Sequence, residues 1–189
     1  MTINASCFAL VALAGCAAIP KPLAPATASP FTIATLGIHR AEMIAALEHY
    51  EQAGDFPIDP KTSYPVSEFR DERGVRCPMA ELIYQSGHGD LVDAVVHTNN
   101  KLRLADVHSG PLYDWMLDSG LTVQEIAMVQ GALQLDVNNR FPRQLVIAAT
   151  NARIHGRLEV AVQALRTATP YSLAEAAAKL PHGALVAAR

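Results

Sequence analysis

Cys77 is the side chain best placed to act as a nucleophile, because it lies between Arg76 and Pro78. Proline suits the first position of a helix, so Cys77 is expected at the helix cap. There the helix dipole and the neighbouring cation both favour the thiolate, which is the reactive form. A base would also be needed, and His88 and His108 are the candidates. Free cysteines are commonly buried, however, so the favoured prediction places Cys77 in the core and assigns no catalytic residue.

The seven histidines of the chain form none of the common metal-binding patterns, such as HExxH, HxH or a cysteine-paired spacing. Asp93 and His97 are four residues apart, so on a helix they share a face, with Asp90 one turn earlier. An exposed ion pair and a helix cap explain these residues more simply than a metal site does. No metal and no other cofactor is therefore predicted.

Other enzyme signatures are missing as well. The sequence contains neither GxSxG nor GxxxxGK[ST], the motifs of serine hydrolases and phosphate-binding loops. Glu81 and Glu125 could meet as the carboxylate pair of a glycosidase, but surface and capping roles are favoured. Tyr113 and Trp115 are candidates for a partner-binding surface, with the core as the alternative position of Trp115.

The charge of the chain argues against nucleic acid as a partner. Fifteen Lys and Arg residues face 18 Asp and Glu residues, which gives a net charge of −3. No basic stripe is present, whereas phosphate contacts usually supply most of the affinity for nucleic acid. The length of 189 residues, half of them hydrophobic, fits one domain.

The N-terminus carries the clearest functional signal. Residues 5–19 are uncharged, but this run is shorter than the roughly 20 residues that a membrane-spanning helix needs, so a secretory signal is favoured over a transmembrane anchor. The motif Leu13-Ala14-Gly15-Cys16 resembles the lipobox of bacterial lipoproteins. This resemblance implies cleavage before Cys16 and acylation of its thiol. Residues 1–6 lack Lys and Arg, which departs from the usual signal pattern. A plain secretory signal and a disordered cytosolic tail remain the alternatives.

Three parts of the chain are expected on this basis: a signal peptide over 1–15, a tether rich in Pro and Ala over 16–35, and a folded domain over 36–189. Proline and small residues give the tether nothing to bury. Loss of residues 1–15 removes Cys7, and acylation occupies Cys16. Cys77 then remains as the only thiol, so no intramolecular disulfide is predicted.

Apolar residues recur at spacings of three and four from residue 36 onward, which predicts a mainly helical, all-α domain. The first helix is expected over 39–53. A proline-rich arm over 55–69 follows, held on the core by Phe56, Tyr64 and Phe69. Four short helices come next, and their starts are marked by Pro78, Asp90, Pro111 and the capping box Thr122-x-x-Glu125.

The region from residue 142 onward is open to two interpretations. Residues 142–168 fit two helices broken near Gly156, which is the favoured prediction, or a β-hairpin. A last helix is predicted from a second capping box, Ser172-x-x-Glu175, with a stop at Pro181.

Residues 69–130 resemble a recurring segment of uncharacterised exported bacterial proteins, a lipoprotein-like family to which no activity is attached. The resemblance covers about a third of the chain and implies an exported helical module. It rests on these residues: Phe69, Asp71, Gly74, Arg76, Cys77, Ala80, Leu82, Ile83, Ser86, Gly87, Leu91, Val92, Asn99, Asn100, Gly120, Leu121, Thr122, Glu125, Ile126, Ala127 and Gln130.

The functional hypothesis from the sequence is a helical domain anchored through lipidated Cys16 on the extracytoplasmic side of a membrane, in the periplasm or at the outer membrane. Its expected partners are the membrane and another envelope protein, which it would bind or scaffold without enzymatic turnover. The alternatives are an extracytoplasmic enzyme that uses Cys77 and the binding of a small ligand between helices.

Overall fold

A computed structural model describes residues 30–135 and 142–180. Six helices account for most of these residues: α1 (Pro30–Ala53), α2 (Pro78–Gln85), α3 (Gly89–Asn99), α4 (Pro111–Asp118), α5 (Val123–Gly131) and α6 (Arg143–Lys179), with a short 3-10 helix at Leu104–Asp106. Over the described ranges, extended pairing is limited to two isolated bridges in the arm between α1 and α2. The prediction of a mainly helical, all-α domain is confirmed.

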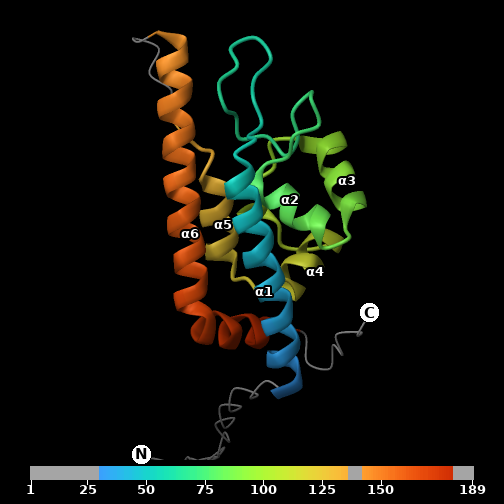
Figure 1. Cartoon of the computed structure of the whole chain (residues 1–189). Coiled ribbons are helices and arrows are strands. Elements are labelled where there is room, and N and C mark those ends of the chain that lie inside the picture. The colour runs from blue at the N-terminus through green and yellow to red at the C-terminus, as the bar shows by residue number, and fades with distance from the viewer. Residues whose placement is uncertain (1–29, 136–141, 181–189) are drawn as a thin grey trace, which may run out of the picture.

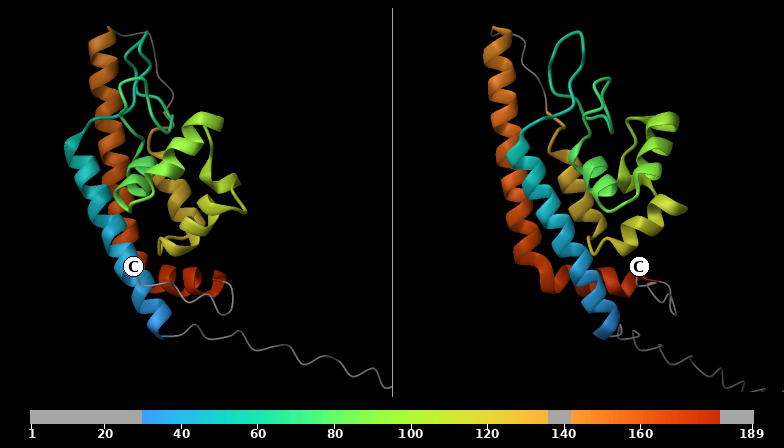
Figure 2. Two further views of the ribbon diagram at one scale, coloured as in Figure 1. Left: turned by 90° about the vertical axis from the view of Figure 1, so that its right-hand side faces the viewer. Right: turned by 45° about the vertical axis from the view of Figure 1, so that its right-hand side comes forward.

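The two long helices α1 and α6 lie side by side, and the short helices α2 to α5 pack beside them (Figures 1 and 2). One hydrophobic core joins the two groups. Most of its fully buried side chains come from α1, α2, α5 and α6, among them Leu47, Met79, Leu82, Ile83, Ile126, Ile154, Leu158 and Leu165, and Val92 of α3 and Leu104 of the 3-10 helix are fully buried as well.

The helix starts marked by Pro78, by Pro111 and by the Thr122–Glu125 capping box are confirmed. Asp90 is not a cap, because α3 begins at Gly89 and its N-cap residue is His88. The proline-rich arm is irregular, as expected.

Two of the three aromatic residues predicted to hold the arm are buried. Phe56 and Phe69 are 3% and 1% exposed, whereas Tyr64 is half-buried.

Helix α1 starts at Pro30, nine residues earlier than predicted, so residues 30–35 of the expected tether are helical. The added turns have a packing partner. Leu36 is fully buried against Ala176 and Ala177 at the far end of the chain. This contact joins segments about 140 residues apart, which a local apolar pattern does not reveal.

Helix α6 is continuous from Arg143 to Lys179, so both the break near Gly156 and the hairpin over 142–168 are wrong. Ile154, Leu158 and Leu165 form an inward row at helical spacing and are fully buried. Leu158, Val160 and Val162 alternate as in a strand, but Val160 is 66% exposed because it lies on the outer face of the helix.

Near its C-terminal end α6 bends sharply (Figures 1 and 2), and the one proline inside the helix is Pro170. Proline lacks the backbone N–H that a helix interior needs and its ring crowds the preceding turn, which accounts for the bend. Ser172 therefore lies inside α6, and its predicted capping box with Glu175 is wrong. The Ser172 hydroxyl instead donates to Oε1 of Glu125, at 2.7 Å. Pro181 lies outside the described residues.

Arg40 and Glu125 form a buried ion pair that joins α1, α5 and the bend of α6. Arg40 is 1% exposed, and its Nη1 and Nη2 donate to the two carboxylate oxygens of Glu125 at 2.9 and 2.6 Å. The remaining N–H groups reach the carbonyl oxygens of Gly120 and Leu165 and the hydroxyl of Thr169. All five donors of the guanidinium are thus used.

The carboxylate of Glu125 stays charged in this cluster. Burial alone would raise its pKa, but hydrogen bonds from Arg40, Thr122 and Ser172 outweigh burial and hold the pKa below its usual range. Gly120 allows the close approach of α1, because a Cβ there would lie 2.3 Å from the carbonyl oxygen of Leu36.

Candidate binding groove between the first two helices

Cys77 is the N-cap residue of α2, as predicted, and its thiol accepts a hydrogen bond from the N–H of Ala80. The side chain is nevertheless buried, with 4% of the residue exposed. Burial raises the pKa of the thiol to about 11, although backbone N–H groups at the helix start lower it in part. The thiol is therefore protonated at neutral pH, which is the opposite of what a nucleophile needs.

The two candidate bases do not pair with Cys77. His88 caps α3, and its Nδ1 lies 3.3 Å from the hydroxyl of Ser86. His108 is exposed. Among the described residues, no hydrogen bond joins either histidine to the Cys77 thiol. The structure does not assemble the catalytic grouping considered from the sequence.

Trp115 belongs to the core and not to a partner-binding surface. It is 5% exposed, and its Nε1 donates to the Ser86 hydroxyl at 2.9 Å. Tyr113 is half-buried and packs against the same core. These two candidates therefore offer little surface to a partner.

The predicted pair of Asp93 and His97 is replaced by an ion pair between Asp93 and Arg70, with 2.6 Å between the oxygen and Nη1. Asp90 is exposed in the first turn of α3. Over residues 30–135 and 142–180, no group of three or more His, Cys, Asp or Glu side chains is arranged to hold a metal ion.

Glu81 and Glu125 belong to two separate ion pairs. Glu125 is held in the buried cluster by Arg40. Glu81 of α2 pairs with Arg76, which precedes this helix. Each carboxylate therefore has its own arginine. The glycosidase arrangement considered from the sequence is not formed.

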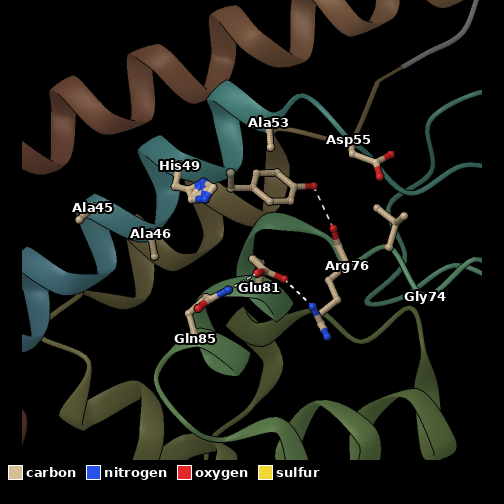
Figure 3. Close-up of a pocket in the computed structure, with 11 residues that line it drawn as sticks. Ala45, Ala46, His49, Ala53, Asp55, Gly74, Arg76, Glu81 and Gln85 are labelled. Atoms are coloured by element: carbon tan, nitrogen blue, oxygen red, sulfur yellow. Dashed lines mark hydrogen bonds and ion pairs between the residues drawn. The ribbon is translucent and has the colours of Figure 1, made fainter.

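The structure shows a groove that the sequence did not indicate, between α1, α2 and the loop before α2 (Figure 3). Its volume is about 470 Å³. Three alanines of α1 leave this space unfilled because their side chains are short: Ala45, Ala46 and Ala53. Glu81 and Gln85 of α2 face them, and Arg76 closes one end.

Arg76 is held in a fixed orientation at the end of this groove. Its Nη1 donates to Oε2 of Glu81 at 2.7 Å, and its Cζ lies 3.6 Å from the centre of the Tyr84 ring. Gln85 donates to the other oxygen of Glu81, at 2.6 Å, which fixes the carboxylate in turn. The Nε of Arg76 is shielded from solvent and has no hydrogen-bond partner. An unsatisfied buried donor typically costs about 1–3 kcal/mol, so it calls for an explanation.

The backbone at Arg76 is positioned from two sides. On the α1 side, the Tyr50 hydroxyl donates to the Arg76 carbonyl oxygen at 2.9 Å. Burial raises the pKa of Tyr50, so this hydroxyl keeps its proton and remains a donor. On the loop side, residues Arg70 and Arg76 form an antiparallel bridge.

The loop between these two arginines is built around the carboxylate of Asp71. It accepts hydrogen bonds from the N–H groups of Ile58, Arg73 and Val75. Burial alone would raise the pKa of Asp71, but these N–H groups and the Arg73 guanidinium hold it below its usual range. A turn with an internal ion pair between Arg73 and Asp71 is therefore present, and it presents Arg76 to the groove.

No family model, curated protein or solved structure matches this chain. Cys16, the predicted signal peptide and most of the predicted tether lie outside the described residues. None of the described helices is both long enough and apolar enough to cross a membrane.

Proposed function

We propose that this protein is a lipid-anchored, extracytoplasmic interaction module that binds another protein of the bacterial envelope through the α1–α2 groove. The observation that carries the proposal is the fixed Arg76 at the end of a groove whose α1 wall carries three alanines beside His49 and Tyr50. A partner segment that offers a carbonyl or carboxylate oxygen would accept hydrogen bonds from the exposed part of this guanidinium, since the Arg76 side chain is 22% exposed.

The groove is prepared for binding before the partner arrives. Glu81, Gln85 and the Tyr84 ring already restrict Arg76, so little side-chain freedom remains to be lost on association. The alanines of α1 leave room for a partner side chain beside His49 and Tyr50. Arginine and tyrosine are also enriched among the residues that dominate binding energy at interfaces.

The lipid anchor is proposed from Leu13-Ala14-Gly15-Cys16 and the proline-rich residues that follow it. A Cys16→Ser variant should leave the membrane fraction, and intact-mass measurement should show acyl chains on the wild-type protein. Recovery of wild-type protein in the soluble fraction, with residues 1–15 still present, would contradict the anchor.

The use of Cys77 as a nucleophile is the weaker alternative, because burial raises its pKa to about 11. A small ligand in the α1–α2 groove is the stronger alternative, because 470 Å³ falls within the usual size of small-molecule sites.

A matched pair of substitutions tests the groove. Ala41 and Ala45 are both exposed on α1, but only Ala45 lines the groove. The Ala45→Phe side chain should fill the groove and abolish recovery of partner proteins after crosslinking in membranes, whereas Ala41→Phe should leave recovery unchanged. Equal recovery with both variants would contradict the proposed site.

A further inference from the structure

We infer that a second pocket, between α6 and the arm that follows α1, binds a free α-amino acid with an apolar side chain. The inference does not depend on the proposed function, because this pocket shares only Asp55 with the α1–α2 groove. Figure 3 shows the Asp55 carboxylate directed away from Glu81 and Gln85 of the groove. The volume of the second pocket is about 270 Å³, which suits a ligand of few atoms.

Asp55 and Arg73 place one anion and one cation side by side at this pocket. Oδ1 of Asp55 lies 3.4 Å from Nη2 of Arg73, and their side chains are 63% and 45% exposed. An α-amino acid carries its ammonium and its carboxylate on the same carbon atom. The ammonium can therefore donate to Asp55 while the carboxylate accepts from Arg73. A simple anion or a simple cation would leave one of these two side chains facing a like charge.

Arg73 is oriented before a ligand arrives. Its Nε donates to the buried carboxylate of Asp71 at 2.9 Å, and its Nη2 donates to the carbonyl oxygen of Phe56 at 2.9 Å. Within the ranges that the structure describes, the N–H groups of Nη1 have no acceptor. They are therefore free to form charge-assisted hydrogen bonds with a carboxylate, and little side-chain freedom is lost when they do so.

Ser63 of the arm and Asn151 of α6 add two neutral polar groups to the lining. Among the described residues, Ser63 is the only one other than glycine with a positive φ, at 59°. Such a conformation is costly and persists where the surroundings enforce it, often at ligand sites. The Ser63 hydroxyl accepts from Arg143, so its own proton remains available. The side-chain amide of Asn151 has no hydrogen-bond partner in the described part of the chain, so both groups can donate to a ligand carboxylate.

Phe56, Ile58 and Ile147 form the apolar part of the lining. Phe56 is buried in the main core, whereas Ile58 and Ile147 are half-buried. An apolar surface with a few convergent polar groups is the usual composition of a small-ligand site. The apolar side chain of an amino acid would cover these residues, so the pocket should favour leucine over a charged amino acid such as lysine.

Isothermal titration calorimetry of the full chain in mild detergent tests this assignment, with L-leucine as the probe. Leucine should bind, and two molecules that each lack one of its charged groups should bind at least about tenfold more weakly. These molecules are isocaproate, which has no ammonium group, and isoamylamine, which has no carboxylate. L-Lysine should also bind more weakly than leucine. Absence of leucine binding at millimolar concentration, or equal binding of leucine and isocaproate, would overturn the inference.

Two pairs of variants locate the site. Asp55→Asn should weaken leucine binding at least about tenfold. Asp93→Asn is its matched control, because Asp93 is a similarly exposed carboxylate paired with an arginine, and it should leave binding unchanged. Asn151→Phe should fill the second pocket and abolish binding, whereas Ala45→Phe, which fills the α1–α2 groove, should leave binding intact.

The circular dichroism spectrum of each variant shows whether it is folded. If Asn151→Phe does not fold, Asn151→Leu takes its place, because it removes the amide and keeps the size of the side chain. Loss of leucine binding in Ala45→Phe, with binding retained in the Asn151 variant, would move leucine to the groove and overturn the inference. Unchanged binding in Asp55→Asn would also overturn it.

Discussion

Two arginine–glutamate pairs of this domain have opposite surroundings. Arg40 is 1% exposed and uses all five of its N–H donors, four of them on Glu125 and on two backbone carbonyls. The side chain of Arg76 is 22% exposed, and its Nε has no acceptor although solvent does not reach it. An arginine whose N–H donors are all used within the protein has none left for a ligand and contributes to the stability of the fold. An arginine that is partly exposed beside a groove is suited to recognition through its exposed N–H groups.

The largest effect is expected from Arg40→Met. The substitution leaves the Glu125 carboxylate buried without its cation, which typically costs about 3–5 kcal/mol. The free energy of unfolding, measured by urea denaturation with circular dichroism, should fall by about that amount. The double variant Arg40→Met, Glu125→Leu should recover part of it, because no charge is then left buried. A loss below about 1 kcal/mol for Arg40→Met would contradict the structural role of the pair.

Acid should weaken the same cluster. Glu125 has a lowered pKa in the folded protein, so its charged form stabilises the fold at pH values above the unfolded pKa of about 4.3. That stabilisation is lost as the pH falls through the folded pKa. Urea unfolding at pH 7, 5 and 3 should show a decline below about pH 4.5. Glu125→Gln should be less stable at pH 7 and should show a shallower decline, with the remainder due to other carboxyls of lowered pKa, which include Asp71 and Asp59. Parallel declines in the two proteins would exclude Glu125 as a source.

Cys77 should behave as a core residue. With a pKa raised to about 11, it should react slowly with iodoacetamide at pH 7 in the folded protein and rapidly in denaturant. Cys77→Ala should cost on the order of 1 kcal/mol through lost packing. Rapid alkylation of the folded protein at pH 6, together with unchanged thermal stability of the alanine variant, would restore the nucleophile hypothesis.

The smallest change in stability is expected from Arg76→Met. Its ion pair with Glu81 is partly exposed, and such pairs contribute about 0–1 kcal/mol. The substitution also removes the unsatisfied Nε, so thermal unfolding should shift little. Partner recovery should nevertheless be lost, whereas Arg166→Gln, which breaks the exposed pair with Glu48, should retain it. If Arg76→Met lost as much stability as Arg40→Met, both arginines would serve to stabilise the fold, and the contrast between them would be wrong.

The sequence predicted those parts of the fold that depend on near neighbours. Pro78, Pro111 and the Thr122–Glu125 box mark helix starts because each acts within one turn of its own helix. The position of Cys77 at a helix cap was predictable for the same reason. Its protonation state was not, because it depends on burial by residues from other helices.

The errors fall where distant contacts decide the outcome. Helix α6 remains continuous as far as Lys179 because its inward row packs on the rest of the core, and because Ser172 turns to Glu125 and not to its own backbone. The groove also depends on two segments that are distant in sequence. Neither the alanines of α1 nor Arg76 by itself indicates a groove. The alanines at 45, 46 and 53 were not a sufficient signal, because Ala34 and Ala41 of the same helix do not line the groove.

The cluster around Arg40 also bears on the order in which the chain can fold. The donor in α1 and the hydroxyl of Thr169 are 129 residues apart in the sequence. During synthesis from the N-terminus, the guanidinium must wait for nearly the whole domain to emerge before its last acceptor exists. Contacts of such long sequence separation form slowly and late. A domain that closes only when its final helix has emerged leaves its N-terminal half without these packing partners for longer.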